Sequence, residues 1–188
     1  MSDKELNLLI DETAQVSPSA KFEGVGTVVI GEYSIIEDNV LLSLGTNSSA
    51  KIEIGLRSKI KLGSILRCYD GVIRIGNRSS IGEYCVLTGH GGLYLGDAVI
   101  VAGHCYFTAA EHLMSSDIEI RFQGETAAGI RLEDNVWVGA HCTITDSVNI
   151  GQGSIIGAGS VVTRSLPPNY VCLGSPCRPL RPREKNWK

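Results

Sequence analysis

The sequence predicts an all-β solenoid, and two observations support this fold class. From Leu132 onward an aliphatic residue begins every block of six residues, and the fifth places hold small or apolar residues. Glycine fills several second places, where it suits a tight turn. A period of six is typical of a β-solenoid in which each block forms one strand and one turn, and three blocks form a triangular coil. The block heads are Leu132, Val138, Ile144, Ile150, Ile156 and Val162.

The same period occurs in the N-terminal half of the chain. Ile75, Ile81 and Leu87 begin three blocks. Two extra residues follow, and three more blocks begin at Leu95, Val101 and Phe107. Looser traces begin at Ile30, Ile36 and Ile54. We therefore expect β-helix coils over residues 21–107 and 130–167 of a single domain.

Three segments lack the period. Residues 108–129 are read as a loop that leaves the solenoid, and long excursions from compact repeats are more often functional than idle. Residues 1–20 are expected to cap the open first coil, since the ends of a solenoid must be covered. After Pro167 and Pro168, residues 168–188 are expected to form a short basic C-terminal tail.

Composition narrows the class of protein. The formal net charge of −3 shows no basic excess of the kind that binds nucleic acid. No run of about 20 apolar residues predicts a membrane span, and the start MSDKELN does not resemble a signal peptide. We therefore expect a soluble cytoplasmic protein.

The chain has six cysteines, and none of them form a CxxC pair of the kind that binds metal or carries redox chemistry. Cys85, Cys105 and Cys142 hold the fifth places of their blocks, so we expect them to pack inward.

Two stretches resemble a known family. IRLEDNVWVGAHCTI and IGQGSIIGAGSVVTRSLPPNYVCLGSPCRPLRPR are similar to the hexapeptide-repeat acyltransferases, above all to galactoside and maltose acetyltransferases and to the O-acetyltransferases of surface polysaccharides. The resemblance covers about residues 16–183 and is specific from about residue 75. It implies a left-handed parallel β-helix, a homotrimer with sites between subunits, and acetyl transfer from acetyl-CoA to a hydroxyl of a sugar or polysaccharide precursor.

The resemblance also implies catalytic residues. His112, in TAAEHLM, matches the family's general base, and an imidazole titrates near neutral pH, as deprotonation of a sugar hydroxyl requires. Glu111 either orients the ring or points elsewhere. Trp137 matches a tryptophan that walls the active site, and packing alone is its other interpretation. No serine or cysteine is evidently paired with a base, so we expect direct attack without a covalent acyl-enzyme.

By the same match, six residues fall on positions that bind the donor. Small side chains would let the pantetheine arm approach the backbone, and arginines suit the phosphates. The other interpretation of the arginines is a solvated basic tail. The six residues are Ala140, Ala158, Thr163, Arg164, Arg178 and Arg181.

Three histidines occupy fourth places of their blocks: His90, His104 and His141. His104 and His141 are expected to stack about 4.8 Å apart, with Tyr84 before them and Gly159 after them. These rings either line the acceptor side of the site or form a polar surface ladder.

A zinc site is the alternative interpretation of the histidines. A γ-class carbonic anhydrase would hold zinc on three histidines, two of them five residues apart on one coil. That spacing is absent here, so we expect no metal.

The acceptor is the least determined part of the prediction. The galactoside enzymes place an asparagine where this chain has Tyr84, Cys85 and Val86, while the excursion is more similar to that of the polysaccharide O-acetyltransferases. A xenobiotic acetyltransferase that acts on an antibiotic hydroxyl is the alternative enzyme. A non-catalytic β-helix scaffold is the alternative outside enzymes.

Overall fold

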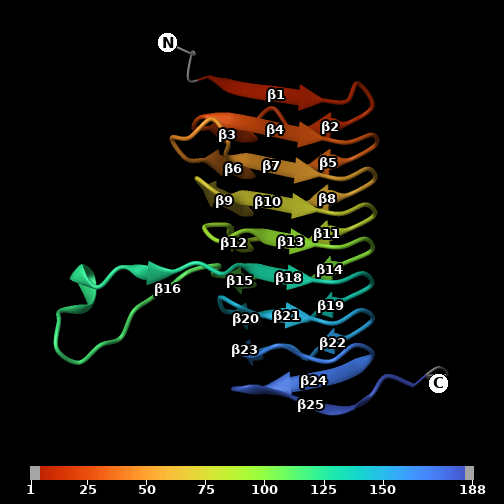
Figure 1. The fold of residues 1–188 in the computed structure, drawn as a ribbon. Helices are drawn as coiled ribbons and strands as arrows, with labels where there is room; N and C mark the ends of the chain where they lie inside the picture. Colours follow the sequence, from red (N-terminus) through yellow and green to blue (C-terminus); the bar gives the residue numbers. More distant parts are fainter. Residues whose placement is uncertain (1–4, 185–188) are drawn as a thin grey trace.

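The computed structural model describes residues 5–184, which fold as a left-handed parallel β-helix of seven coils (Figure 1). The coils stack in chain order, and the segment between β15 and β18 is the long projection from the stack. The solenoid prediction is confirmed. The first four residues of the expected cap and the last four of the expected tail lie outside the described residues.

Each of the seven coils contributes one strand to each of three sheets, in which these strands are parallel, and the second sheet is extended by β24 and the antiparallel β25. The first sheet contains β1 (Leu6–Ile10), β4 (Gly26–Ile30), β7 (Lys51–Ile54), β10 (Val72–Ile75), β13 (Leu93–Leu95), β18 (Ile130–Leu132) and β21 (Asn149–Ile150). The second contains β2 (Gln15–Val16), β5 (Ile35–Ile36), β8 (Lys59–Ile60), β11 (Ser80–Ile81), β14 (Ile100–Val101), β19 (Trp137–Val138), β22 (Ile155–Ile156), β24 (Tyr170–Gly174) and β25 (Cys177–Pro182). The third contains β3 (Lys21–Glu23), β6 (Leu41–Leu44), β9 (Ile65–Tyr69), β12 (Val86–Thr88), β15 (Tyr106–Phe107), β20 (Thr143–Ile144) and β23 (Val161–Val162).

The solenoid is a triangular prism whose three corners are the turns between successive sheets. We call the turns that join the second sheet to the third sheet the second corner. The turns that join the third sheet to the first are the third corner. The excursion leaves from the third corner, between β15 and β18.

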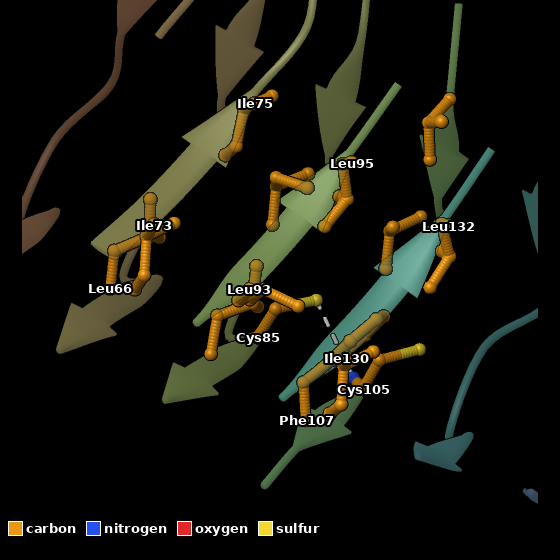
Figure 2. Close-up of a cluster of buried hydrophobic side chains, with 14 of the residues drawn as sticks. Leu66, Ile73, Ile75, Cys85, Leu93, Leu95, Cys105, Phe107, Ile130 and Leu132 are labelled. Carbon is orange, nitrogen blue, oxygen red and sulfur yellow. Dashed lines mark hydrogen bonds between the residues drawn. The ribbon is translucent and has the colours of Figure 1, made fainter. Parts of the chain in front are cut away.

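The period of six follows from this geometry. Block heads stack on block heads: Leu132 pairs with Ile150, and Val138 pairs with Ile156. Successive side chains of a strand point to opposite faces, so the head points into the prism and its predecessor points out. All six heads from Leu132 to Val162 are 0–1% exposed. Figure 2 shows the resulting core between β9 and β18, filled by aliphatic chains around Phe107.

The fifth places form a ladder of small polar side chains inside the second corner. Cys85, Cys105 and Cys142 are buried, which confirms their inward packing. Each thiol donates to a carbonyl of the next coil at 3.2 Å, as Cys85 does to Ala102 and Cys105 to Gly139. The Ser64 hydroxyl makes the same bond at 2.7 Å. The thiols therefore satisfy turn carbonyls as well as filling space.

The two ends of the solenoid differ from the expectations. Residues 6–16, expected as part of a cap, form β1 and β2 of the first coil. β1 pairs with β4 in register, with Leu8 beside Val28, because its alternating leucines follow the period of a strand. Leu8 stays 42% exposed, since no described coil lies before it.

At the C-terminus, residues 170–182 of the expected tail form the hairpin β24–β25. β24 pairs in parallel with β22, and β25 returns antiparallel to it. Cys172 and Cys177 are buried by this arrangement. The hairpin therefore covers the last coil, because the apolar run from Tyr170 to Cys172 continues the pattern of a strand past the prolines.

No helix among residues 5–184 is long and apolar enough to span a bilayer. The described helix is the three-residue 3-10 turn η1 (Ile120–Phe122) in the excursion.

Candidate active site

The excursion carries His112 on a short hairpin. β16 (Glu111–His112) pairs antiparallel with β17 (Glu125–Thr126). The Leu113 N–H donates to the Gly124 carbonyl at 3.1 Å and closes the end of this stem. The His112 side chain is exposed. His112 therefore lies on a paired stem within the segment that projects from the solenoid (Figure 1).

Strand alternation predicts that the Glu111 side chain points away from the His112 ring. The two residues are adjacent in a strand, where successive side chains point to opposite faces. The Glu111 backbone carbonyl accepts the Thr126 hydroxyl at 3.3 Å, so its main chain helps to hold the stem together.

Asp146 anchors the root of the excursion, and the sequence analysis missed it. Its carboxylate accepts the backbone N–H of Ala128 at 3.0 Å and that of Gly129 at 2.7 Å. Asp146 is only 6% exposed, although it carries an ionisable group. On the outgoing side, the Gly91 N–H donates to the Ala109 carbonyl at 3.1 Å. The available signal was an acid in the block that begins at Ile144, at the same corner as the one from which the excursion leaves one coil earlier.

Gln123 ties together the tip of the same excursion. Its side-chain oxygen accepts the Ser115 N–H at 2.6 Å, and its amide nitrogen donates to the carbonyls of Ser115 at 2.9 Å and Ile118 at 2.5 Å. A single side chain therefore closes the segment from residue 115 to residue 123. Gly124, whose carbonyl closes the His112 stem, follows directly.

The predicted ring column is present at the second corner. The ring centroids of Tyr84 and His104 lie 5.4 Å apart at an interplanar angle of 21°, and those of His104 and His141 lie 5.0 Å apart at 6°. Glu83 lies beside the column, and its pKa is lowered by its own backbone N–H and then by the Lys61 ammonium at 3.1 Å. His112 stems from the third corner, so one protomer does not place it in this column.

His90 is not part of that column. It belongs to the third block of its coil and therefore lies at the third corner, where its ring stacks on Tyr69 with centroids 3.6 Å apart. Its Nδ1 atom is buried without a hydrogen-bond partner. The neighbouring Gly91 contacts the root of the excursion at Ala109. His90 thus lies at the same corner as the root of the loop that carries His112, and the other two histidines lie at the second corner.

Trp137 lies on the outer face of the second sheet rather than at a corner. In β19 it precedes the buried head Val138, so its side chain points outward, and it is 50% exposed. It pairs with Ile100 of β14, which is 51% exposed, and with Ile155 of β22. These side chains make a flat apolar strip on the second sheet.

The six expected donor positions lie in three places on the protomer. Ala140 and Ala158 stack at the second corner beside His141, and the Gly159 N–H donates to the Ala140 carbonyl at 2.8 Å. Arg178 is close to this corner, just after the turn that joins β24 to β25.

The other donor positions lie elsewhere on the protomer. Thr163 and Arg164 follow β23 at the third corner. Arg181 lies within β25, opposite Val171, and its guanidinium is 3.8 Å from Glu184. One protomer therefore does not gather all six.

Three of the buried thiols are poor nucleophiles because their pKa values are raised. Burial raises the pKa of the Cys68 and Cys172 thiols to about 11. Contact with Cys105, followed by burial, raises the pKa of Cys142. Because the thiolate is the reactive form, none of these three groups is suited to carry an acyl group.

Residues 5–184 contain no group of three or more His, Cys, Asp or Glu side chains that could hold a metal ion.

A hollow of about 780 Å³ lies over the N-terminal coils, lined among others by Leu9, Glu53, Leu56 and Arg74. None of the expected site residues lines it.

Comparison with known proteins places the chain in a family. The family model described as bacterial transferase hexapeptide (six repeats) matches residues 129–164. The galactoside O-acetyltransferase of Escherichia coli is 41% identical over 88 residues, which are 46% of this chain and 42% of that protein. A probable acetyltransferase of Mycobacterium tuberculosis is 26% identical over 144 residues, 76% of this chain and 48% of that one. The chain spans about half the length of the curated relatives that it matches.

Solved structures extend the similarity to most of the chain. The N-acyltransferase AntD of Bacillus cereus, in complex with dTDP and coenzyme A, is 25% identical over 96% of this chain and 83% of that one, with a TM-score of 0.62. A hexapeptide-repeat acetyltransferase of Vibrio cholerae is 30% identical over 70% of this chain and 74% of that one, with a TM-score of 0.63, and has also been solved with acetyl coenzyme A. The chain belongs to the hexapeptide-repeat family of acetyltransferases.

Proposed function

We propose that this protein transfers an acetyl group from acetyl-CoA to a hydroxyl of a sugar or glycan precursor. Family membership supports the reaction class, and the Vibrio cholerae relative in complex with acetyl coenzyme A supports the donor. The galactoside O-acetyltransferase match supports a sugar acceptor. The observation that carries the proposal is His112, exposed on a paired stem whose root is tied to the solenoid.

In the proposed mechanism His112 acts as general base. Its imidazole takes the proton of the acceptor hydroxyl as the oxygen attacks the thioester carbonyl, and then returns the proton to the departing thiolate of coenzyme A. Backbone N–H groups of a neighbouring coil stabilise the oxyanion. The inward thiols with raised pKa values support direct attack over an acyl-enzyme.

We propose a homotrimer with sites between protomers. Within one protomer the second corner holds Ala140, Ala158 and the ring column, whereas His112, Thr163 and Arg164 belong to the third corner. Packing the second corner of one copy against the third corner of another would bring both groups to one site. The excursion also exposes an apolar set that a second copy would cover: Leu113, Met114, Ile118, Ile120 and Phe122, each 44–83% exposed.

An amine acceptor is the second candidate. The similarity to an N-acyltransferase extends over 96% of this chain, which is more than the galactoside enzyme covers.

We also propose a cytoplasmic location. The six cysteines are free thiols, and the cytoplasm keeps thiols reduced.

Release of free coenzyme A, followed with a thiol reagent, tests the reaction against a panel of sugars, amino sugars and hydroxyl-bearing antibiotics. We expect turnover with a sugar that offers only hydroxyl groups, and loss of about 10²–10⁴-fold in kcat for His112→Ala. A much smaller loss would remove His112 from the role of base. Turnover confined to amino sugars would favour N-acylation, and turnover confined to antibiotics would favour the xenobiotic reaction. Light scattering of the purified protein tests the trimer.

A further inference from the structure

The stem that carries His112 also carries Glu125 on the same face. In the two-stranded sheet of β16 and β17, His112 pairs directly with Glu125. Glu111 pairs with Thr126, one step along the same ladder. Residues that lie directly opposite each other in a ladder point to the same face of the sheet, and the next pair points to the other face. His112 and Glu125 therefore share one face of the stem, and Glu111 belongs to the opposite face.

The hydrogen-bond pattern of the stem brings this pair close together. The Leu113 N–H donates to the Gly124 carbonyl at 3.1 Å, so these two residues form a hydrogen-bonded pair. Such pairs alternate with non-hydrogen-bonded pairs along an antiparallel ladder, and His112 with Glu125 is the next pair. In a non-hydrogen-bonded pair the Cα atoms lie only about 4.5 Å apart and the side chains approach more closely. The Glu125 carboxylate is therefore within reach of the His112 ring.

Both side chains are available for this contact. They are exposed on the projecting segment, and in the single protomer neither side chain has a hydrogen bond or an ion pair with a described residue. Among residues 5–184 the strand that pairs with β16 is β17, and Glu125 is its ionisable residue. Packing of the excursion against a second copy, as the proposed trimer requires, would exclude water from the pair and strengthen its attraction.

We propose that Glu125 is a positioning residue for the imidazole of His112. The inference rests on the proposed function, since it takes His112 as the base. A neutral imidazole has one N–H donor and one lone pair. A carboxylate that accepts the N–H of one ring nitrogen keeps the lone pair on the other nitrogen, which can then accept the proton of the sugar hydroxyl. The negative charge also stabilises the imidazolium that forms in this step.

The first test removes the charge from each face of the stem in turn. Glu125→Gln is expected to lower kcat about 10-fold and to leave the KM of both substrates within about 2-fold. Glu125→Asp, which restores the carboxylate, is expected to recover part of kcat. Glu111→Gln is the matched control, because it makes the same change of charge on the opposite face of the same stem. Its kinetics are expected to equal those of the unaltered protein.

The second test observes the imidazole directly. Nitrogen-15 NMR shows which ring nitrogen carries the proton, and comparison with His112→Ala identifies the His112 signals among those of the four histidines. The spectra are recorded at about pH 9, where imidazoles are ordinarily neutral. Glu125→Ala is expected to change the ratio of the two His112 tautomers, and Glu111→Ala is expected to leave that ratio unchanged.

Equal kinetics of Glu125→Gln and Glu111→Gln, or an unchanged tautomer ratio in Glu125→Ala, overturns the role of Glu125 and leaves the proposed function standing. A loss confined to the KM of the acceptor also overturns it, because Glu125 would then bind the acceptor instead of positioning the base. Full activity of His112→Ala overturns the proposed base and the role of Glu125 together.

Discussion

Asp146 Oδ1 lies 2.7 Å from the backbone nitrogen of Gly129, and this contact links the coil after the excursion to the segment that returns from His112. The second carboxylate oxygen accepts the Ala128 N–H at 3.0 Å. A carboxylate that is 6% exposed and accepts two backbone N–H groups fixes the direction of the chain that it holds. The position of the candidate base therefore depends on a residue outside the excursion.

Asp146→Asn is expected to lower both stability and activity. The amide retains one acceptor oxygen and places an NH₂ group against a backbone N–H, which costs about 1–3 kcal/mol of unfolding free energy. We expect kcat to fall about 10- to 100-fold through displacement of His112, with the KM for acetyl-CoA less affected. Denaturant unfolding and steady-state kinetics measure the two effects.

Asp117→Asn is the matched control for this prediction. Asp117 is an exposed aspartate on the same excursion, and its carboxylate accepts the Ser116 hydroxyl at 3.0 Å. An Asp146→Asn variant with the kinetics of Asp117→Asn would show that the root contact does not position His112.

Gln123→Ala is expected to lower kcat about 10-fold by loosening the tip that continues into the His112 stem. The side chain makes three hydrogen bonds within the excursion and none to the solenoid core, so unfolding free energy should change little. Gln152→Ala, at an exposed corner of the first and second sheets, is the matched control.

Combining the substitution with His112→Ala shows how Gln123 acts. If Gln123 acts through His112, Gln123→Ala has no further effect on kcat in the His112→Ala background. Multiplicative effects of the two substitutions would contradict this and indicate an independent role for the tip.

Stability is expected to decrease with acid, in part through Asp97. The backbone N–H of Asn77, at 2.8 Å from Oδ1, holds the pKa of this carboxyl below its ordinary value of 3.8. A pKa lowered in the folded state favours folding above the unfolded-state value, and this contribution is lost as pH falls through the folded-state value. Asp97→Asn should therefore cost about 0.5–1 kcal/mol at pH 7, a modest amount because the side chain is 39% exposed.

The difference between Asp97→Asn and the unaltered protein should be complete above about pH 5 and shrink below pH 3.8. Urea unfolding from pH 3 to pH 7 measures it. A constant difference over that range would show that the lost contribution is steric rather than electrostatic.

The period of six determined which residues point inward, but it did not determine the contacts of the segments that break it. Ile144 and Cys142 were placed correctly because strand alternation fixes the face of every residue in a regular coil. The stack of His104 on His141 followed from the same register. Asp146 and Gln123 were missed because their partners are backbone groups of an irregular loop, which has no period. The hairpin β24–β25 was read as a tail because its prolines and arginines obscured a strand of five residues.

The buried thiols allow a test of whether the reaction passes through a covalent acyl-enzyme. All six cysteines of the chain lie in the described residues and are buried, and burial raises the pKa of Cys68 and Cys172 to about 11. The native protein should therefore react slowly with an aromatic disulfide reagent at pH 8, while the protein in guanidinium chloride should release six equivalents. Cys142→Ser should retain activity, because Ser160 holds the same place in the next coil and its hydroxyl donates to the same Gly157 carbonyl at 2.6 Å. Rapid labelling of one native thiol together with loss of activity in Cys142→Ser would instead support a covalent acyl-enzyme, and direct attack by the acceptor would be wrong.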